Sequence, residues 1–226
     1  MITQNPNISL KGKVAFISGA SKGIGVSIAE LFAVAGCDLA LTARNEQELD
    51  QTAKNARKAG VNVWTQTAEM SDADEVKAVG NAALAEFGHI DILVNNAGVT
   101  IPQLILETTL ENFQTIINVN VLAPFLLTQI FAPSMIAKKK GKIVNVTSRA
   151  AIRAFPTGSV YSASKGALQL LTQSMAVEFG PHNIQTNSVA PTVTMTPMGD
   201  NAWPPSPRRD AKLAKIPTGR FAEPEE

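Results

Sequence analysis

The fold is decided close to the N-terminus by residues 14–25, which read VAFISGASKGIG. The apolar run from Val14 to Ser18 predicts a buried strand, and helical spacing from Ile24 to Ala35 predicts a helix that ends before Gly36. Glycines between the two allow a tight turn and let a pyrophosphate approach the backbone, while the N-terminus of the following helix favours its charge. We therefore expect a dinucleotide at this turn, bound by Gly19, Ser21, Lys22, Gly23, Ile24 and Gly25.

The rest of the chain continues to alternate short apolar runs with helical segments. Further strands are predicted at residues 39–42, 61–67, 90–94, 142–146 and 184–189, and further helices at residues 47–59, 72–87, 111–137 and 160–179. Ser71 is the predicted N-cap of the helix at 72–87. Short strands that are apolar on both faces and separated by helices indicate a parallel sheet with helices on each side. The predicted fold class is α/β, a Rossmann-type doubly wound sheet in a single domain, residues 1–226.

The C-terminal segment, residues 191–226, differs from the rest of the chain. It holds seven of the thirteen prolines and shows no strand pattern, so we expect a loop with a short helix around Arg208 to Lys215. Ligands of doubly wound sheets bind beyond the carboxyl ends of the strands. We therefore interpret residues 191–226 as the substrate loop of the domain.

Composition narrows the possible partners. The chain has 226 residues with 20 Lys and Arg against 19 Asp and Glu, so no broad basic surface favours nucleic acid or an acidic membrane. With Cys37 as the one cysteine and only two histidines, no Cys/His metal site is expected and a His-based hydrolase triad is disfavoured. Polar residues interrupt the apolar stretch from Ile116 to Pro133, and Met1 to Leu10 lack the pattern of a signal peptide. We expect a cytoplasmic protein with a small-molecule partner.

The end of the second predicted strand indicates which dinucleotide binds. An acidic residue there favours the ribose 2′-hydroxyl of NAD, whereas arginine suits a 2′-phosphate. This chain has Thr42-Ala43-Arg44-Asn45 and no carboxylate. Arg44, assisted by Lys22 in the glycine turn and flanked by Asn45, therefore favours NADP(H) over NAD(H). The alternative is that Arg44 is an ordinary exposed loop arginine.

A second cluster carries acid–base chemistry. Tyr161 and Lys165 are four residues apart at the start of a predicted helix, hence on one face. A neighbouring ammonium favours the phenolate, so we expect Lys165 to lower the pKa of Tyr161 and make it a general acid and base. Ser148 follows the strand predicted at 142–146, where its hydroxyl can hold a carbonyl oxygen beside the tyrosine.

Taken together, these motifs resemble the short-chain dehydrogenase/reductase family, with Asn95-Asn96-Ala97-Gly98 after the fourth strand, Asn120, and Pro191-Thr192 after the sixth. The resemblance covers about Leu10 to Glu226. It implies a catalytic tetrad of Asn120, Ser148, Tyr161 and Lys165. It also implies cofactor contacts from Glu69 and Met70 near adenine, Asn96, Ala97 and Gly98 near the ribose, and Pro191, Val193 and Thr196 near the nicotinamide. Glu69 stands where the family usually has Asp. The tail is similar to that of the L-xylulose (dicarbonyl) reductase subgroup.

The resemblance further implies interconversion of a ketone, such as a ketose or small dicarbonyl, and a secondary alcohol. NADPH would deliver hydride while Tyr161 donates a proton, Ser148 binds the same oxygen, Lys165 holds the nicotinamide ribose and Asn120 supports a water. A polar residue such as Asn120 can open the hydrogen-bond ladder of a long helix to make room for that water. Reduction of 3-oxoacyl groups on acyl carrier protein is one alternative. A non-catalytic dinucleotide sensor is the alternative of another class.

Substrate contacts are expected from Ser148, Arg149, Tyr161 and Trp203. For Arg149 and Arg153 the alternative is pairing with surface carboxylates. Trp203 and Met198 form either an apolar lid or a contact that packs the tail onto the body. Family members are usually dimers or tetramers joined through the two long helices, which implies a homodimer or homotetramer. Their chains continue beyond Glu226 through a further helix and strand, so we expect an incomplete sheet, lower stability and a compromised oligomer interface.

Overall fold

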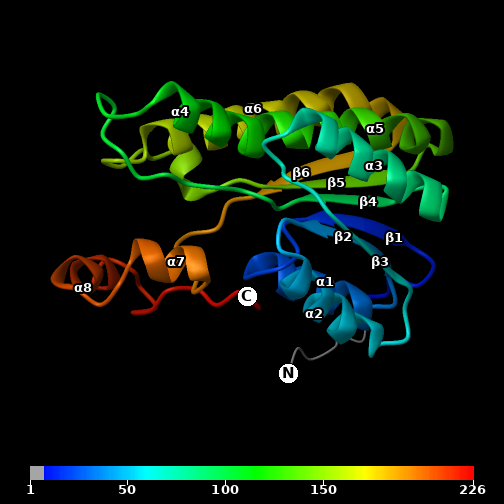
Figure 1. Cartoon of the computed structure of the whole chain (residues 1–226), viewed down its shortest axis with the longest axis horizontal. Helices are drawn as coiled ribbons and strands as arrows, with labels where there is room; N and C mark the ends of the chain where they lie inside the picture. Colours follow the sequence, from blue (N-terminus) through cyan, green and yellow to red (C-terminus); the bar gives the residue numbers. More distant parts are fainter. Residues whose placement is uncertain (1–7) are drawn as a thin grey trace.

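The computed structural model describes residues 8–226 and shows a six-stranded parallel sheet between two layers of helices (Figure 1). The strand order is β3-β2-β1-β4-β5-β6, which confirms the doubly wound α/β fold. The strands are β1 (Val14–Ser18), β2 (Asp38–Ala43), β3 (Val63–Thr67), β4 (Ile92–Asn95), β5 (Gly141–Val146) and β6 (Ile184–Val189). Every neighbouring pair of strands is parallel, so all their carboxyl ends lie along one edge.

Helices cover both faces of the sheet. They are α1 (Ile24–Val34), α2 (Glu46–Arg57), α3 (Ala73–Phe87), α4 (Leu110–Ile117), α5 (Ala123–Lys138), α6 (Ser159–Phe179), α7 (Pro197–Ala202) and α8 (Pro207–Leu213). Figure 1 shows α1 and α2 below the sheet and α3, α4, α5 and α6 above it, with α7 and α8 beyond one end. The layers therefore leave the carboxyl edge of the sheet open toward α7 and α8.

The alternation of side chains along β1 produces two cores. Val14 and Phe16 pack toward α3 and α5, where the Phe16 and Phe131 ring centroids are 5.0 Å apart. Ala15 and Ile17 pack on the other face, toward α1 and α2. Both faces of β1 are thus buried, as a central strand of a parallel sheet requires.

The predicted long helix at 111–137 is a continuous helical stretch from Leu110 to Lys138 with a π-helical turn, η1 (Asn118–Leu122), inside it. By length and apolarity alone this stretch could cross a membrane. Half of its most apolar window is buried in the fold, however, and Leu127 and Phe131 belong to the core between the sheet and the layer of α3 and α5. Packing against the sheet therefore accounts for its apolar composition.

Two local expectations need correction. Asp72, not Ser71, caps α3, because its carboxylate accepts hydrogen bonds from the amides of Asp74 and Glu75 at 2.8 and 3.1 Å. The C-terminal segment contains α7 as well as α8, although only a helix near 208–215 was expected. A Thr-Pro start signals α7: Thr196 Oγ1 accepts from the Gly199 amide at 3.1 Å, and Pro197 occupies the first helical position.

After β6 the described chain adds no strand to the sheet. Thr194 and Ala222 form an isolated parallel bridge within the C-terminal segment, and Phe221 is buried. β6 is therefore an edge strand, on which Gln185 and Asn187 are exposed. Neither α7 nor α8 has a buried residue, so this segment rests on the body rather than forming part of its core.

Candidate active site

The glycine turn between β1 and α1 fits a pyrophosphate. Gly19 and Gly23 have φ values of 68° and 54°, which residues with a side chain rarely adopt. A Cβ on Gly25 would lie 2.2 Å from the Gly19 carbonyl oxygen, so the turn is closed tightly on itself. No side chain caps the N-terminus of α1. Its first amides are therefore available to an anion, which is the arrangement that dinucleotide pyrophosphates use.

The turn is braced from the neighbouring strand. The Asn96 side-chain amide donates to the carbonyl oxygens of Ser18 and Gly19, both at 3.0 Å. The Ser18 hydroxyl in return accepts from the amides of Asn96 and Ala97 at 3.2 and 3.1 Å. The Asn96 side chain thus holds the turn in shape. The bracing role of Ser18 was not predicted, although a hydroxyl at the end of β1 was its signal.

The two cations proposed for a 2′-phosphate both face carboxylates. Lys22 Nζ lies 2.7 Å from Glu48 Oε1, and Arg44 lies 3.4 Å from Glu69 Oε2. Both basic side chains remain more than half exposed at the carboxyl edge of β1 and β2. The chain segment at 42–45 indeed lacks an acid, but β3 brings Glu69 to the same place.

Other residues expected at the adenosine end have structural contacts. Asn45 caps α2 by accepting from the Glu48 amide at 3.0 Å. Glu69 also accepts a hydrogen bond from the Ser71 amide. Partial burial tends to raise the pKa of Glu69, but its interactions with Ser71 and Arg44 outweigh this effect and lower the pKa. Met70 is buried in the core between the sheet and α3.

Asn120 lies in the π-helical turn with its side chain fully buried. Its amide oxygen accepts from the Val99 amide at 2.9 Å, and its amide nitrogen donates to Val99 O and Ser164 Oγ at 3.0 and 2.9 Å. The side chain therefore joins the loop after β4 to α6. Ser164 was not singled out from the sequence, although it lies in the Tyr-Ser-Ala-Ser-Lys segment, and its hydroxyl donates to Tyr161 O.

Ser148, Tyr161 and Lys165 meet at the carboxyl edge of β5. The Ser148 side chain interacts with the Tyr161 hydroxyl, which tends to lower the pKa of the tyrosine. Lys165 Nζ lies 5.9 Å from the centre of the Tyr161 ring and donates to Val146 O at 2.8 Å. A Cβ on Gly98 would lie 3.1 Å from Lys165 Nζ and 3.4 Å from Asn120 Oδ1, so the Asn120 and Lys165 side chains both approach Gly98.

The expected lowering of the Tyr161 pKa was wrong, since the shift has the opposite direction. Burial raises the pKa of Tyr161, and its interaction with Ser148 opposes this only in part. Burial also lowers the pKa of Lys165 to about 8. The spacing of the two residues could not reveal this, because desolvation depends on what covers the pair rather than on their separation.

The loop after β6 closes the site from the other side. Pro191 O accepts from the Arg149 amide at 3.1 Å, and Val193 O accepts from the Ala222 amide at 3.0 Å. The Thr196 side chain touches the glycine turn, since a Cβ on Gly23 would lie 2.7 Å from its methyl group. Pro191 and Thr196 thus span the space between the glycine turn and Ser148.

Trp203 packs within the C-terminal segment. Its ring centroid lies 6.0 Å from that of Phe221, and Arg208 and Lys212 lie 4.5 and 5.5 Å from the ring. Met198 is exposed. The described contacts therefore favour packing of Trp203 inside the tail over a contact with the body.

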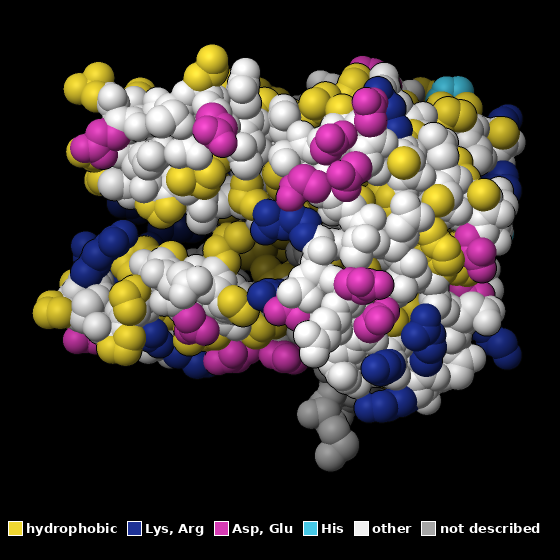
Figure 2. Space-filling model, in the orientation of Figure 1, with side chains coloured by type: hydrophobic (Ala, Val, Ile, Leu, Met, Phe, Trp, Pro, Cys, Tyr) yellow, Lys and Arg dark blue, Asp and Glu magenta, His cyan; other side chains and the backbone are white. Residues whose placement is uncertain are grey.

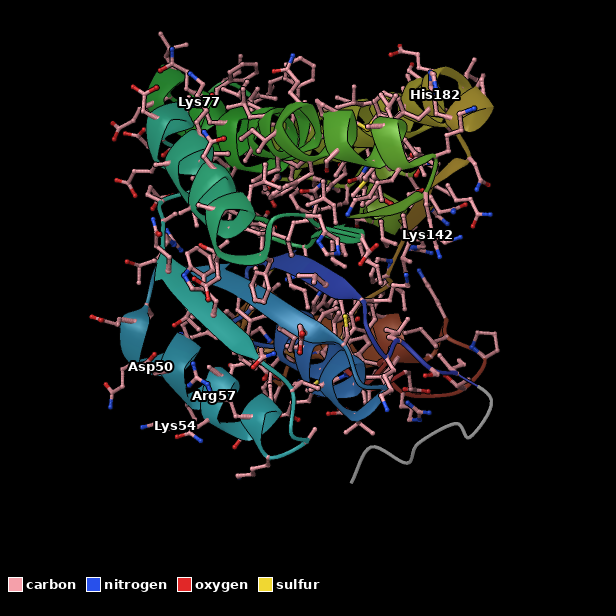
Figure 3. The ribbon with its side chains drawn as sticks, turned by 90° about the vertical axis from the view of Figure 1, so that its right-hand side faces the viewer. Asp50, Lys54, Arg57, Lys77, Lys142 and His182 are labelled. Carbon is pink, nitrogen blue, oxygen red and sulfur yellow. The ribbon has the colours of Figure 1, made fainter. Side chains whose placement is uncertain are left out.

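The opposite edge of the sheet holds none of these groups. Figure 3 views the molecule from the amino ends of the strands and shows Lys142 and His182 there. His89 pairs with Asp91 at 3.3 Å just before β4, also at an amino end. Both histidines therefore lie at the edge of the sheet opposite to Ser148.

Together the doubly wound sheet, the glycine turn and the Ser-Tyr-Lys cluster define a dinucleotide-dependent oxidoreductase site. Residues 13–206 match the model of the short chain dehydrogenase family. L-xylulose reductase of Bos taurus is 40% identical over 218 residues, covering 96% of this chain and 86% of that protein. The 3-oxoacyl-[acyl-carrier-protein] reductase FabG of Thermotoga maritima is 37% identical over 217 residues, covering 96% and 87%.

Solved structures agree with these sequence relatives. A putative NAD(P) dependent gluconate 5-dehydrogenase from Beutenbergia cavernae with bound NADP superimposes with a TM-score of 0.91 at 29% identity, covering 96% of this chain and 86% of that one. The chain belongs to the short-chain dehydrogenase/reductase family and is an oxidoreductase that acts on CH–OH groups. The family uses NAD(P) as its cofactor.

Proposed function

We propose that this protein interconverts a small ketone and a secondary alcohol with NADP(H), using Tyr161 as the general acid and base. The observation that carries the proposal is that the Ser148 and Tyr161 side chains interact at the carboxyl edge of β5, with Lys165 Nζ 5.9 Å from the centre of the tyrosine ring. When bound, NADP(H) would supply or accept the hydride. Residues 191–226 would form the substrate loop of this single domain.

Each side chain has a part that follows from its surroundings. The raised pKa of Tyr161 keeps its phenol protonated at neutral pH, so a proton is available to a carbonyl oxygen that becomes an alkoxide. The Ser148 hydroxyl would hold the same oxygen. Below its pKa of about 8, Lys165 would present an ammonium to the phenol and to the nicotinamide ribose. Asn120 would hold the Gly98–Val99 loop and, within the π turn, support a water.

Removing the phenol hydroxyl tests the chemical step. General acid catalysis contributes roughly 100- to 10,000-fold, so Tyr161→Phe is expected to lower kcat by about 1,000-fold. NADPH affinity, measured by fluorescence titration, should stay close to wild type because the ring is kept. Ser162→Ala is the matched control, since this neighbouring buried hydroxyl has no hydrogen-bond partner in the structure. Substantial turnover by Tyr161→Phe would refute the proton-donor role.

The preference for NADP(H) is supported by the two exposed cations at the carboxyl edge of β1 and β2. A 2′-phosphate near Arg44 and Lys22 would take the place of the Glu69 and Glu48 carboxylates as their counter-ion. Bound NADP in the related gluconate 5-dehydrogenase structure is compatible with this choice. The other expected cofactor contacts, from Ser21, Ile24, Ala97 and Val193, are proposed on their places around the same edge.

Reversing the charge at Arg44 tests the preference. Arg44→Asp is expected to raise KM for NADPH by about tenfold more than KM for NADH, because an attraction to the 2′-phosphate becomes a repulsion. Lys54→Asp is the control, since Lys54 lies on the outer side of α2 (Figure 3). Equal changes of KM for the two cofactors would refute the assignment.

The substrate proposed is a ketose or small dicarbonyl, supported by the likeness to L-xylulose reductase. The second candidate, reduction of 3-oxoacyl groups on acyl carrier protein, is favoured by the likeness to the Thermotoga maritima reductase. NADPH absorbance with ketoses, diketones and acetoacetyl thioesters separates the two. Tight NADPH binding with no turnover across that panel would instead favour a non-catalytic sensor.

A cytoplasmic homodimer or homotetramer is proposed on the apolar surface of the long helices. Leu110 and Phe113 on α4 are exposed, as are Leu170 and Val177 on α6. Exposed apolar side chains on adjacent helices are typical of subunit contacts. Sedimentation of the purified chain gives its mass in solution, and a monomer at micromolar concentration would contradict the proposal.

A further inference from the structure

Cationic side chains gather on both walls of the cleft beyond the carboxyl ends of β5 and β6. Arg149 and Arg153 come from the segment that follows β5, and Arg208, Lys212 and Lys215 come from α8 and its end. Figure 2 shows Lys and Arg side chains on both sides of the cleft between the upper helices and α8. Two segments that are far apart in sequence thus place positive charges around the same cleft.

These cations lack acidic partners. Within residues 8–226, none of these five side chains makes an ion pair, whereas Lys13, Lys22 and Arg44 each do. Residues 148–158 hold two arginines and no carboxylate, and residues 203–216 hold four basic residues and only Asp210 as an acid. The possibility that Arg149 and Arg153 pair with surface carboxylates is therefore not realised in this structure.

The two walls interact electrostatically. Lys212 is half-buried, and its pKa is lowered by burial and by the positive charges of Arg149, Arg153 and Lys215. Unpaired like charges facing one another across a cleft are unfavourable unless a ligand neutralises them. The positive charges on the two walls therefore favour the binding of an anion between them.

Contacts with Trp203 hold the basic side chains of α8 in place. Arg208 and Lys212 lie 4.5 and 5.5 Å from the Trp203 ring. Arg209 donates to Trp203 O at 2.9 Å, which ties the start of α8 to the same residue. On the other wall, Arg149 directly follows Ser148, and its amide donates to Pro191 O. The basic cluster, defined as Arg149, Arg153 and Lys212, thus includes the residue that directly follows Ser148.

We propose that the carbonyl substrate of this enzyme carries an anionic group, a carboxylate or a phosphate, which the basic cluster binds while Ser148 and Tyr161 hold the carbonyl. This inference rests on the proposed function, because it places the anion beside the reacting carbonyl. Guanidinium groups suit both oxyanions, since their paired N–H donors match two oxygens at once. Trp203 would orient the cluster without contacting the carbonyl.

A small anionic molecule fits this place better than a carrier protein. Arg149 directly follows Ser148, so we place the anionic group and the carbonyl on one small molecule. On a carrier protein, a long pantetheine arm separates the acidic surface from the reacting ketone. The basic cluster would then lie alongside an apolar acyl chain, which gains nothing from it.

The experiment compares ketones that differ only in charge. 5-Keto-D-gluconate is L-sorbose with its terminal CH₂OH replaced by a carboxylate, and D-xylulose 5-phosphate is D-xylulose with a phosphate ester. We expect NADPH oxidation to show kcat/KM at least tenfold higher for one charged member than for its neutral partner, with the favoured pair identifying carboxylate or phosphate. The preference should decline with added NaCl, since salt screens exposed charges.

Charge removal then locates the anion. Arg153→Gln and Lys212→Gln should each lower the charged-to-neutral ratio of kcat/KM by about fivefold, as expected for partly exposed charge pairs. Lys140→Gln is the matched control, because Lys140 precedes β5 and so lies at the opposite edge of the sheet. It should leave the ratio unchanged.

The outcomes separate this inference from the proposed function. Turnover of neutral ketoses with no preference for either charged partner would overturn the anion site and leave the proposed function standing. A charged preference that survives both cluster variants would also overturn it. If no ketone is reduced, binding still tests the site. Calorimetry would compare the affinity of each charged compound, 5-keto-D-gluconate or D-xylulose 5-phosphate, with that of its neutral partner, L-sorbose or D-xylulose, for the protein with NADP⁺. Equal affinity within both pairs would refute it, whereas tighter binding of a charged member, weakened by Lys212→Gln, would support it.

Discussion

The two walls of the cleft are held in place by different forces. On the sheet side, Asn120 and Lys165 are buried and hydrogen-bonded to the backbone of neighbouring elements. On the other side, α7 and α8 contain no buried residue, and Trp203 packs mainly against Phe221 of the same segment. The catalytic wall is thus part of the core, whereas the substrate wall rests on it.

This difference shows how one fold can keep its chemistry while its substrate varies. A change at a buried, hydrogen-bonded residue costs stability as well as activity. A change on α8 alters charge or shape at the cleft without opening a cavity in the core. The two walls meet where the Thr196 methyl group touches Gly23 and where Arg149 bonds Pro191. Variation on α8 therefore acts on the substrate more than on the fold.

The largest contrast between the two regions is expected from alanine at two glycines. At Gly25 a Cβ would lie 2.2 Å from Gly19 O and 2.6 Å from Asn96 Nδ2, so the turn must deform. Overpacking of this kind costs about 3 kcal/mol. If the whole cost falls on the conformation that binds NADPH, the affinity for NADPH is lowered roughly 100-fold. Fluorescence titration of Gly25→Ala measures this loss.

Gly219→Ala in the C-terminal segment is the matched variant. Its φ of 69° is strained for alanine, but no atom lies within 4 Å of the added carbon. We expect a cost of about 1 kcal/mol confined to that loop and unchanged NADPH binding. Equal losses of affinity in the two variants would show that the tail and the glycine turn form one unit.

A somewhat smaller contrast is expected between polar side chains of the two walls. Asn120→Ala removes three hydrogen bonds and leaves the amide and carbonyl of the partly buried Val99 without these partners, at a cost of about 3 kcal/mol in the free energy of unfolding. Ser206→Ala removes the N-cap bond to the Arg209 amide, which costs about 1 kcal/mol within α8. Urea denaturation followed by far-UV circular dichroism compares them. A smaller shift for Asn120→Ala than for Ser206→Ala would contradict the division between the walls.

The sequence sufficed for the parts of the site that depend on local patterns. β1 and β6 begin and end at the predicted residues, because apolar runs there stop abruptly at polar or glycine-rich turns. The opening of the long helix at Asn120 was also expected, since a polar side chain inside an apolar helix signals such a break. Tyr161 and Ser148 come together because each lies just beyond the carboxyl edge of a parallel sheet.

Properties that depend on tertiary neighbours were not visible. Lys22 meets Glu48, and Arg44 meets Glu69, only because α2 and β3 return to the glycine turn. The N-cap of α3 is one residue later than predicted. Ser71 and Asp72 are both good N-cap residues, and only the backbone path selects between them. The basic cluster likewise needs the position of α8 relative to β5, which no spacing in the sequence specifies.

Two lysines, one on each wall, give the smallest expected effect. Lys165 has its pKa lowered to about 8 by burial, and its Nζ lies 5.9 Å from the ring centre of Tyr161 on the same helix. If its ammonium holds the cofactor, kcat/KM for NADPH should be flat below about pH 7 and fall about tenfold per unit above about pH 8. Lys212→Gln should keep this fall at the same pH, because Lys212 belongs to the other wall. Persistence of full activity at pH 9.5 would contradict the role of Lys165.

The sign of the stability effect keeps this fall distinct from unfolding. Because the folded pKa of Lys165 is below the ordinary value of 10.5, its charged form disfavours folding at pH values below about 8. That penalty is relieved as the pH rises from about 8 toward 10.5, so Lys165 cannot cause a drop in Tm over the range where activity is lost.

Tyr161 is the one tyrosine of the chain, and tyrosinate absorbance therefore reports it alone. Burial raises its pKa, so a fall in activity near pH 8 with no rise in tyrosinate absorbance over the same range is assigned to Lys165, whereas a parallel rise would assign it to loss of the tyrosine proton.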